Sequence, residues 1–287
     1  VTLNTPVGVI GVDYGMNSMV VDAGTGTISL GTHNGQTWGT VYTISLTGGA
    51  ILSTANLRDY TTLTVNHSAA SSLSGNLTGG GALVKTGAGT LTLSGNNAYT
   101  GATTLNAGLV VIQNGSAIGD ASAVTINNSA QLRMDAGESI GSLAGNSAAA
   151  SLNLQSHTLQ IGDQLGSATV SYDGLISGSG GLVRRGGGTQ TLTGNNSFSG
   201  PVTVMDGGTL SVPSVSASGN QPLGSGTGNI SLDGAGGGAT LAITGAGTYT
   251  LPPNRGLALS GTGGILNVSA GTVNMSGSIT GASNSAH

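Results

Sequence analysis

An internal repeat constrains the fold of this chain of 287 residues more than any other feature. The stretch from Leu83 to Gly101 reads LVKTGAGTLTLSGNNAYTG, and the stretch from Leu182 to Gly200 reads LVRRGGGTQTLTGNNSFSG. Extended to 26 positions, the two copies lie 99 residues apart and share 13 identities. Self-similarity of this kind is typical of arrays in which each repeat covers its neighbour, so the sequence predicts a stacked, repetitive architecture.

Short strands alternate with glycine turns within each copy. In the first copy, residues 83–85 form one expected strand, and the glycines at 87 and 89 turn the chain. Thr90–Leu93 alternates with a period of two, which places its leucines on one face and its threonines on the other. Asn96 and Asn97 suit a tight corner, because Asn tolerates the left-handed backbone. Neither length nor period favours a helix.

The repeat resembles the passenger-associated transport repeat of bacterial autotransporter proteins, whose usual form is close to L-x-K-x-G-x-G-T-L-x-L-x-G-x-N-x-Y-x-G. The second copy departs from it at Arg184, Gln190 and Phe198. The resemblance implies an all-β, right-handed parallel β-helix of an adhesin-like passenger domain, secreted by the type V route to the surface of a Gram-negative bacterium. The first copy matches at Leu83, Lys85, Gly87, Gly89, Thr90, Leu91, Leu93, Gly95, Asn97, Tyr99 and Gly101.

Three sections of one continuous solenoid are expected along the chain. Residues 1–74 carry no clear copy of the repeat and are interpreted as irregular N-terminal rungs, in which Trp38 packs rather than binds. Residues 75–173 form a first repeat module. Residues 174–287 form a second, truncated where a third repeat would start. An insertion after Val212 in the second module is expected to be a loop on one side of the stack.

The amino-acid composition excludes several classes of protein. The 54 glycines and 6 prolines make up about a fifth of the chain, below the roughly 25–30% of disordered low-complexity chains. With six basic and ten acidic residues, the chain has no basic patch with which to bind nucleic acid. The absence of cysteine excludes a disulfide framework and thiolate metal sites.

Targeting signals are missing from the sequence. The chain begins at Val1 without a charged start or an apolar core segment, and no stretch is long and apolar enough for a transmembrane helix. It is therefore interpreted as a piece of a longer protein. Together with the resemblance, this implies an extracellular or cell-surface location, anchored at the outer membrane by a missing C-terminal domain. The implied partner is the outer-membrane translocator barrel of the same polypeptide.

Two patterns resemble catalytic sites. Gly137–Gly141 fits the G-x-S-x-G nucleophile elbow, but that elbow needs a following helix, and more strands are expected here. A β-helix polysaccharide lyase or hydrolase needs clustered carboxylates, often with a basic residue. The best cluster would be Asp135, Glu138 and Asp163 with Arg133, although scattered acids give such groupings by chance.

The remaining ionisable residues suggest no cofactor or metal site. His33, His67, His157 and His287 lack close metal-ligand spacing and are interpreted as solvated or corner histidines. The pair Arg184–Arg185 is interpreted as part of a solvated strand face. No catalytic, cofactor-binding or metal-binding residue is assigned, and the chain is not expected to be an enzyme.

Two functions remain open. The first is a non-catalytic passenger fragment that acts as a rigid stalk or adhesin scaffold, with a host cell, a glycan or further copies of itself as partners. The second is a glycan-active β-helix enzyme whose groove lies partly outside this chain. Sparse charge and only eight aromatic residues favour the first.

Three side chains give specific structural expectations. Tyr99 and Phe198 occupy the same place in the two copies, so each ring should pack over a turn rather than bind a ligand. Gln190 stands where the first copy has Leu91, so it should face the core as a hydrogen-bonded amide. Its replacement by Leu should then be neutral or stabilising, provided that its partners reach water or each other.

Overall fold

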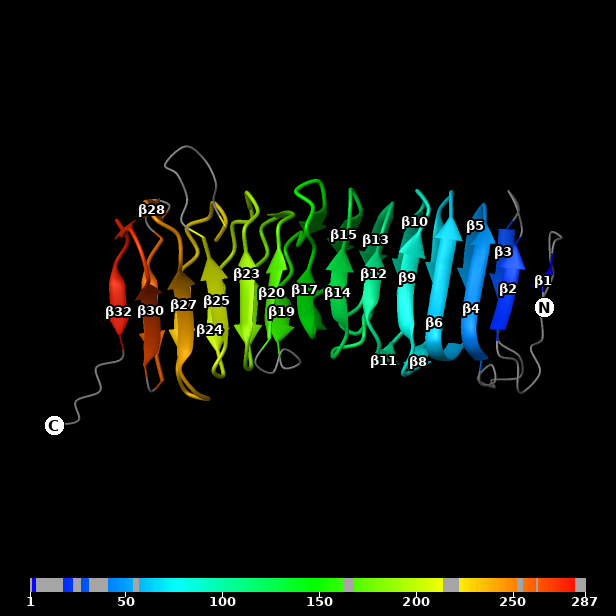
Figure 1. Cartoon of the computed structure of the whole chain (residues 1–287), viewed down its shortest axis with the longest axis horizontal. Helices are drawn as coiled ribbons and strands as arrows, with labels where there is room; N and C mark the ends of the chain where they lie inside the picture. The colour runs from blue at the N-terminus through cyan, green and yellow to red at the C-terminus, as the bar shows by residue number, and fades with distance from the viewer. Residues whose placement is uncertain are drawn as a thin grey trace. The chain divides into compact units, whose positions relative to one another are not determined.

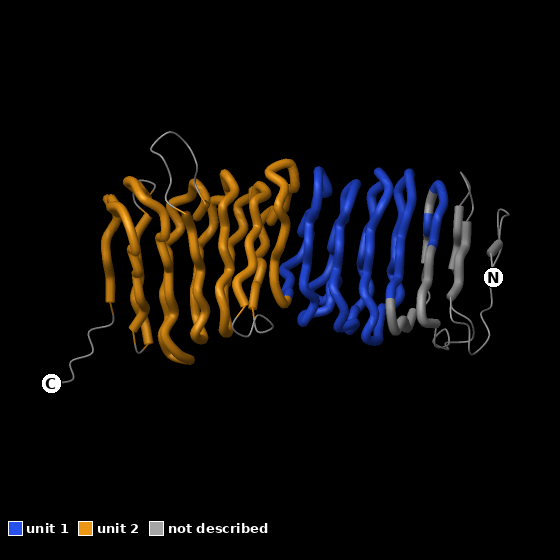
Figure 2. The backbone as a smooth tube through the Cα atoms, viewed as in Figure 1, with its two compact units in different colours: residues 1–140 blue, residues 141–287 orange. Residues whose placement is uncertain are grey.

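The computed structural model describes residues 2–3, 18–22, 27–30, 41–53, 57–162, 168–213, 222–251, 255–261 and 263–281. The chain is an all-β parallel solenoid of about 10 turns, which confirms the predicted fold class. Its handedness and the three repeat-based sections stay predictions. The chain divides into two compact units, residues 1–140 and residues 141–287 (Figure 2).

Unit 1 is built from two long parallel sheets (Figure 1). One sheet runs in the order β1-β2-β4-β6-β9-β12-β14, and the other in the order β15-β13-β10-β7-β5-β3, while β8 pairs with β6 and β11. The strands are β1 (Thr2–Leu3), β2 (Ser18–Asp22), β3 (Thr27–Leu30), β4 (Val41–Gly48), β5 (Ala50–Ser53), β6 (Leu57–His67), β7 (Ser71–Leu73), β8 (Leu77–Gly79), β9 (Ala82–Thr86), β10 (Thr90–Leu93), β11 (Ala98–Tyr99), β12 (Thr103–Leu105), β13 (Leu109–Ile112), β14 (Ala123–Ile126), β15 (Gln131–Met134) and β16 (Glu138–Ile140).

Unit 2 repeats this design. One sheet runs β19-β22-β24-β26-β29-β32 and another β20-β23-β25-β27-β30, while β18 pairs with β21 and β28 with β31. The strands are β17 (Ser142–Ala144), β18 (Ser151–Asn153), β19 (Leu159–Gly162), β20 (Thr169–Tyr172), β21 (Leu175–Ser177), β22 (Leu182–Arg185), β23 (Thr189–Leu192), β24 (Val202–Met205), β25 (Thr209–Val212), β26 (Ile230–Asp233), β27 (Ala239–Ile243), β28 (Thr248–Thr250), β29 (Leu257–Ser260), β30 (Gly264–Val268), β31 (Thr272–Asn274) and β32 (Ile279–Gly281).

The core of each unit consists of columns of apolar side chains from successive turns. In unit 1, Leu73, Leu93, Ile112 and Met134 are register partners on four neighbouring strands, and all four are buried. Strand β10 alternates between buried leucines and half-buried threonines, as its period of two predicts. Because parallel strands lie about 4.8 Å apart, one turn covers the apolar face of the next.

Close stacking also explains the glycine that precedes the paired asparagines in both copies. A Cβ atom on Gly95 would collide with the carbonyl oxygen of Gly75, one turn earlier. A Cβ atom on Gly194 would collide with that of Gly174 in the same way. The repeat therefore requires glycine there so that two corners can approach each other.

Two expectations fall on residues outside the described part of the chain. Trp38 and most of the insertion after Val212 are among them. Within the described residues, no helix is long and apolar enough to cross a membrane.

Candidate functional site

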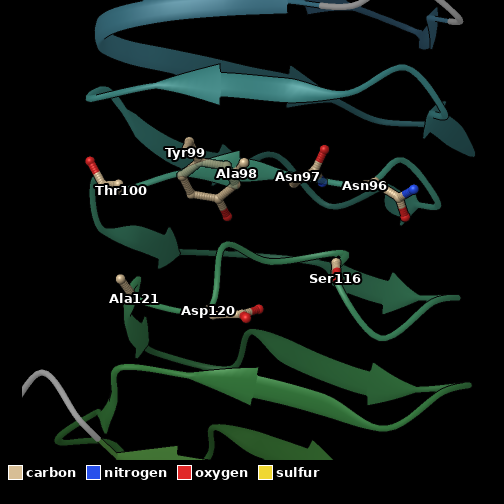
Figure 3. Close-up of a pocket in the computed structure, with 8 residues that line it drawn as sticks. All are labelled: Asn96, Asn97, Ala98, Tyr99, Thr100, Ser116, Asp120 and Ala121. Atoms are coloured by element: carbon tan, nitrogen blue, oxygen red, sulfur yellow. The ribbon is translucent and has the colours of Figure 1, made fainter.

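A surface hollow with a volume of about 410 Å³ lies in unit 1 between two successive corners (Figure 3). Its only charged lining residue is Asp120, an exposed side chain. Tyr99 lines the hollow as well, but its side chain is almost fully buried. Eight residues surround the hollow, namely Asn96, Asn97, Ala98, Tyr99, Thr100, Ser116, Asp120 and Ala121.

Asn97 links three successive corners beneath the hollow. Its Oδ1 atom accepts a hydrogen bond of 2.7 Å from the backbone N–H of Leu77, and its Nδ2 atom donates one of 2.6 Å to the carbonyl of Ala117. Both partners lie 20 residues away, one on the preceding turn and one on the following turn. Since an unpaired buried backbone group costs about 1–3 kcal/mol, the amide is needed to close these corners.

Asn196 has the same role in unit 2. It accepts from the N–H of Ile176 and donates to the carbonyl of Pro222, at 2.7 Å in both cases. Ile176 lies 20 residues before Asn196, which matches the spacing in the first copy, whereas Pro222 lies 26 residues after it. The amide therefore bridges the corners even though this step of unit 2 is longer.

A chain of hydroxyl groups fixes the Tyr99 ring. The Tyr99 hydroxyl lies 2.6 Å from Thr103 Oγ1, which lies 2.8 Å from Ser122 Oγ, and Ser122 donates to the carbonyl of Gly101 at 2.8 Å. A carbonyl only accepts, so Ser122 gives its proton to Gly101, Thr103 gives its proton to Ser122, and Tyr99 gives its proton to Thr103. We call this arrangement the hydroxyl relay.

The second copy replaces the first two members of the relay by apolar residues. Phe198 stands in place of Tyr99, and Val202 in place of Thr103. Both are fully buried, so the expectation that the two aromatic rings pack inside the structure is confirmed. Both rings therefore pack within the stack of turns.

Glu138 continues the polar contacts of the corner by one more turn. Its Oε2 atom accepts from the N–H groups of Ala117 at 3.0 Å and Ile118 at 3.3 Å, and its Oε1 atom from Ser139 N–H at 3.2 Å. The side chain is buried, and this burial raises the pKa of the carboxyl group to about 7, with Asp120 adding to the effect. Ala117 is thus bound by an amide on one side and a carboxyl group on the other.

The expected cluster of carboxylates has separate structural roles. Arg133 forms a bidentate pair with Asp135, with N–O distances of 2.9 and 3.0 Å, on the partly exposed side of strand β15. Glu138 is turned inward to the backbone amides, and Asp163 lies outside the described residues. Among the described residues, no group of three His, Cys, Asp or Glu side chains could hold a metal ion.

The G-x-S-x-G pattern lacks the context of a nucleophile elbow. Ser139 lies in the middle of strand β16, and the next element along the chain is strand β17. An elbow places its serine at a sharp turn between a strand and a helix. Ser139 is therefore a strand residue whose N–H binds the neighbouring carboxylate.

His67 is a buried corner histidine, one of the two alternatives expected for the histidines. It is buried at a corner, where its Nδ1 atom lies 2.7 Å from the carbonyl oxygen of Ala69 and 2.9 Å from Ser71 Oγ. Because a carbonyl can only accept, Nδ1 carries the proton and is not a free base for Ser71. Burial, together with nearby Lys85, lowers the pKa of His67. His157 is half-buried, and His33 and His287 lie outside the described residues.

The cationic position of the repeat faces inward, so the prediction of a solvated strand face is wrong for Arg184. Lys85 Nζ donates to the carbonyls of Thr86 at 2.8 Å, Gly87 at 2.8 Å and Ala107 at 3.2 Å. Burial lowers its pKa to about 8. Arg184 is likewise buried and donates to corner carbonyls, including that of Gly188 at 2.8 Å.

Arg185 is the partly exposed member of the arginine pair. It forms an ion pair of 3.2 Å with Asp206. Because strand side chains alternate between faces, two consecutive cations cannot both be solvated on one strand face. The repeat thus uses its first cation to bind corner carbonyls.

Gln190 faces the core of unit 2 as predicted and is a satisfied amide. Its Nε2 atom donates to the carbonyl of Leu143 at 2.8 Å, and its Oε1 atom accepts from the N–H of Leu143 at 3.2 Å. Weaker contacts reach the carbonyls of Val170 and Thr191. The glutamine therefore binds both backbone groups of one residue.

Two stretches of the chain match a known protein family, and Lys85, Asn97 and Tyr99 lie within the first of them. A family profile described as the passenger-associated-transport-repeat matches residues 83–112 and 182–212. The chain carries two passenger-associated transport repeats. No curated protein and no solved structure matches it significantly. Such repeats in a β-solenoid are typical of autotransporter passenger domains, and they imply secretion to the cell surface or beyond it.

Sequence reasoning missed the asparagine bridges, the relay and the inward cation. The paired asparagines at the same place in both copies were the available signal, but they suggested only a turn. The partners of Asn97 lie one turn away on either side. They can be identified only when the number of residues per turn is known, which the local sequence does not give.

Proposed function

We propose that the chain is a non-catalytic part of an autotransporter passenger, acting as a rigid β-helical stalk or adhesin scaffold at the bacterial surface. The observation that carries this proposal is the use of the repeat's polar side chains. Asn97 and Asn196 each bond backbone groups of neighbouring turns instead of facing solvent. A repeat whose polar side chains bond to the backbone of its own corners serves to stack the turns. Contacts with other molecules are then made by the outer loops.

The proposal includes an anchor and a partner class. A translocator barrel of the same polypeptide would hold the passenger at the outer membrane. Host-cell surfaces, glycans or other copies of the chain would be the partners. The low charge of the chain fits contacts made by neutral polar groups.

Display on cells tests the proposal. The chain is expressed between a signal peptide and a translocator barrel in a Gram-negative host, and antibody binding to intact cells is measured. We expect surface exposure and stronger adhesion than cells with the barrel alone. Asn97→Ala should reduce the protease resistance of the displayed chain, whereas Asn96→Ala, which changes the exposed neighbour, should not.

The enzyme alternative has its own measurement. The purified chain is incubated with a panel of neutral and acidic polysaccharides, and new reducing ends are counted. No cleavage is expected, because Glu138 is bonded to backbone amides and Asp135 to Arg133. Cleavage that disappears in Asp135→Asn would contradict the non-catalytic scaffold.

A further inference from the structure

One outer sheet face of unit 1 carries two parallel columns of neutral side chains, which we call the Thr/Asn face. Strands β4, β6, β9, β12 and β14 lie next to one another in this sheet (Figure 1). The first column is Thr64, Val84, Thr104 and Thr125, and the second is Thr47, Asn66, Thr86, Asn106 and Asn127.

The register of the parallel strands aligns the columns. In the first column, Thr64 pairs with Val84, Val84 with Thr104, and Thr104 with Thr125. The column partners are therefore true neighbours on adjacent strands. Along strands β6 and β9, the two columns are two positions apart, with one inward-facing residue between them, and so lie on the same face.

The second column follows the same order. Thr47 pairs with Asn66, and Asn66 pairs with Thr86. Asn106 follows the end of strand β12, and its N–H donates to the carbonyl of Lys85 at 2.9 Å. Asn127 Nδ2 then donates to Asn106 Oδ1 at 2.9 Å, which lines up these two amides on neighbouring turns.

The inner neighbours of this face hold it in place. On strand β6, Leu63 and Val65 are buried on either side of Thr64, and Leu105 is buried between Thr104 and Asn106. All nine column residues are half-exposed. None of the nine is charged or aromatic. The face is therefore a rigid array of hydroxyl, amide and methyl groups.

The array sets three conditions on a partner. The partner must be neutral, because no column position offers a charge to pair. It must both donate and accept hydrogen bonds, because Thr and Asn side chains do both. It must also be periodic, because the groups repeat at about 4.8 Å from strand to strand and at about 6.6 Å between the two columns of a strand.

We propose that the Thr/Asn face binds ice, that is, the ordered water lattice of a crystal surface. Water in ice is neutral, donates and accepts equally, and repeats in two dimensions at spacings of the same order as the array. A face fixed by backbone ladders has little side-chain freedom to lose on binding, because β-branched Thr is stiff at χ1. This inference does not rest on the proposed stalk or adhesin function.

Other occupants fit the face less well. A neutral glycan is generally held against aromatic rings as well as polar groups, and the nine column residues include no aromatic side chain. A second copy of the chain would satisfy the hydrogen bonds but does not require a two-dimensional repeat. Both serve as alternatives that the experiment separates.

The test measures thermal hysteresis and partition into growing ice for the full 287-residue chain. The comparison uses Thr104→Lys in the middle of the face and Thr92→Lys as a matched control. Thr92 is also half-exposed but lies on strand β10 in the other sheet. We expect hysteresis in the natural chain and in Thr92→Lys. In Thr104→Lys, partition into ice should fall by about tenfold or more, the factor that about 1.4 kcal/mol corresponds to.

Several results would overturn the proposal. An absence of hysteresis in the natural chain would do so, and so would equal loss in both variants at unchanged melting temperatures. Thr125→Lys, on the neighbouring strand of the same column, is the second variant if Thr104→Lys fails to fold. A concentration-dependent dimer that Thr104→Lys dissolves, without hysteresis, would assign the face to a second copy. Binding of a neutral glucan without hysteresis would assign it to a glycan.

Discussion

Removing the Thr103 hydroxyl alone should destabilise unit 1 more than removing it together with the Tyr99 hydroxyl. Thr103→Val takes away both the acceptor of Tyr99 and the donor to Ser122. It leaves the proton of the buried Tyr99 hydroxyl without its nearest acceptor, at a cost of about 1–3 kcal/mol. Tyr99→Phe removes the hydrogen bond to Thr103 but leaves no hydroxyl proton unpaired at that position, so its cost should be about 0.5–1.5 kcal/mol.

The double variant Tyr99→Phe with Thr103→Val should cost less than the sum of the two single changes. Neither the unpaired phenol nor its acceptor remains, and Ser122 keeps its bond to Gly101. We expect a favourable coupling energy of about 1–2 kcal/mol, within the range for residues in one hydrogen-bonded network. The measurement is chemical denaturation of the natural chain and the three variants. The comparison requires that the free energy of unfolding depends on denaturant concentration with the same slope in all four proteins.

The second copy supplies the matched control. Phe198→Tyr places a hydroxyl where Val202 offers no acceptor, so it should destabilise unit 2, and Val202→Thr should recover part of the loss. Additive effects within about 0.5 kcal/mol in both copies would refute the direction of proton donation inferred for the relay.

Three further predictions concern buried polar groups. Gln190→Leu should lower the free energy of unfolding by about 1–3 kcal/mol, because both backbone groups of Leu143 lose their partner; an unchanged denaturation midpoint would contradict this. The pKa of Glu138 is raised to about 7, so its contribution to stability is fullest below pH 4.5 and is lost as the pH rises to 7. Glu138→Gln should remove the fall in melting temperature between pH 4.5 and pH 7. If the fall persists in this variant, another titrating group causes it. The pKa of Lys85 is lowered to about 8, so its contribution to stability should rise from pH 8 to 10.5, and Lys85→Met should remove this rise in the same assay.

The prediction for Gln190→Leu differs from the sequence-based expectation for a physical reason. A neutral or stabilising effect required that the amide's partners reach water or each other. Two of the partners are the N–H and C=O groups of one buried residue, Leu143, and these groups cannot bond to each other. Burial of the amide was predictable from the register of the repeat. The identity of its partner, 47 residues away, was not.

The solenoid fold could be predicted from the sequence because the patterns that indicate it are local. The alternation of Thr90–Leu93 and the glycines at corners act over two to four residues, and both copies carry them. The inward turn of Lys85 follows from the same alternation, since Leu83 and Lys85 share a face. The prediction of a solvated cation at Arg184 failed because it weighed charge above register. The carbonyls of a tight corner supply enough acceptors to hold a buried cation.

The candidate catalytic residues show the opposite limit. Glu138 and Asp135 lie close in sequence, but neighbours three residues apart on a solenoid can belong to different environments. One carboxyl group is buried against Ala117 and Ile118 on the preceding turn, and the other is partly exposed beside Arg133. Their roles depend on which turn packs above them, and sequence spacing does not contain that information.

The two repeats show how a buried corner tolerates change in a stack of this kind. Both keep the asparagine bridge, because its partners are backbone groups that every sequence presents. They differ at the relay, where one copy is polar throughout and the other has Phe198 and Val202. A tyrosine opposite a valine would lose the acceptor of its buried hydroxyl, so a tyrosine at this place depends on the threonine beside it. The asparagine bridge is therefore common to both copies, whereas a tyrosine at the aromatic position is paired with a threonine and a phenylalanine with a valine.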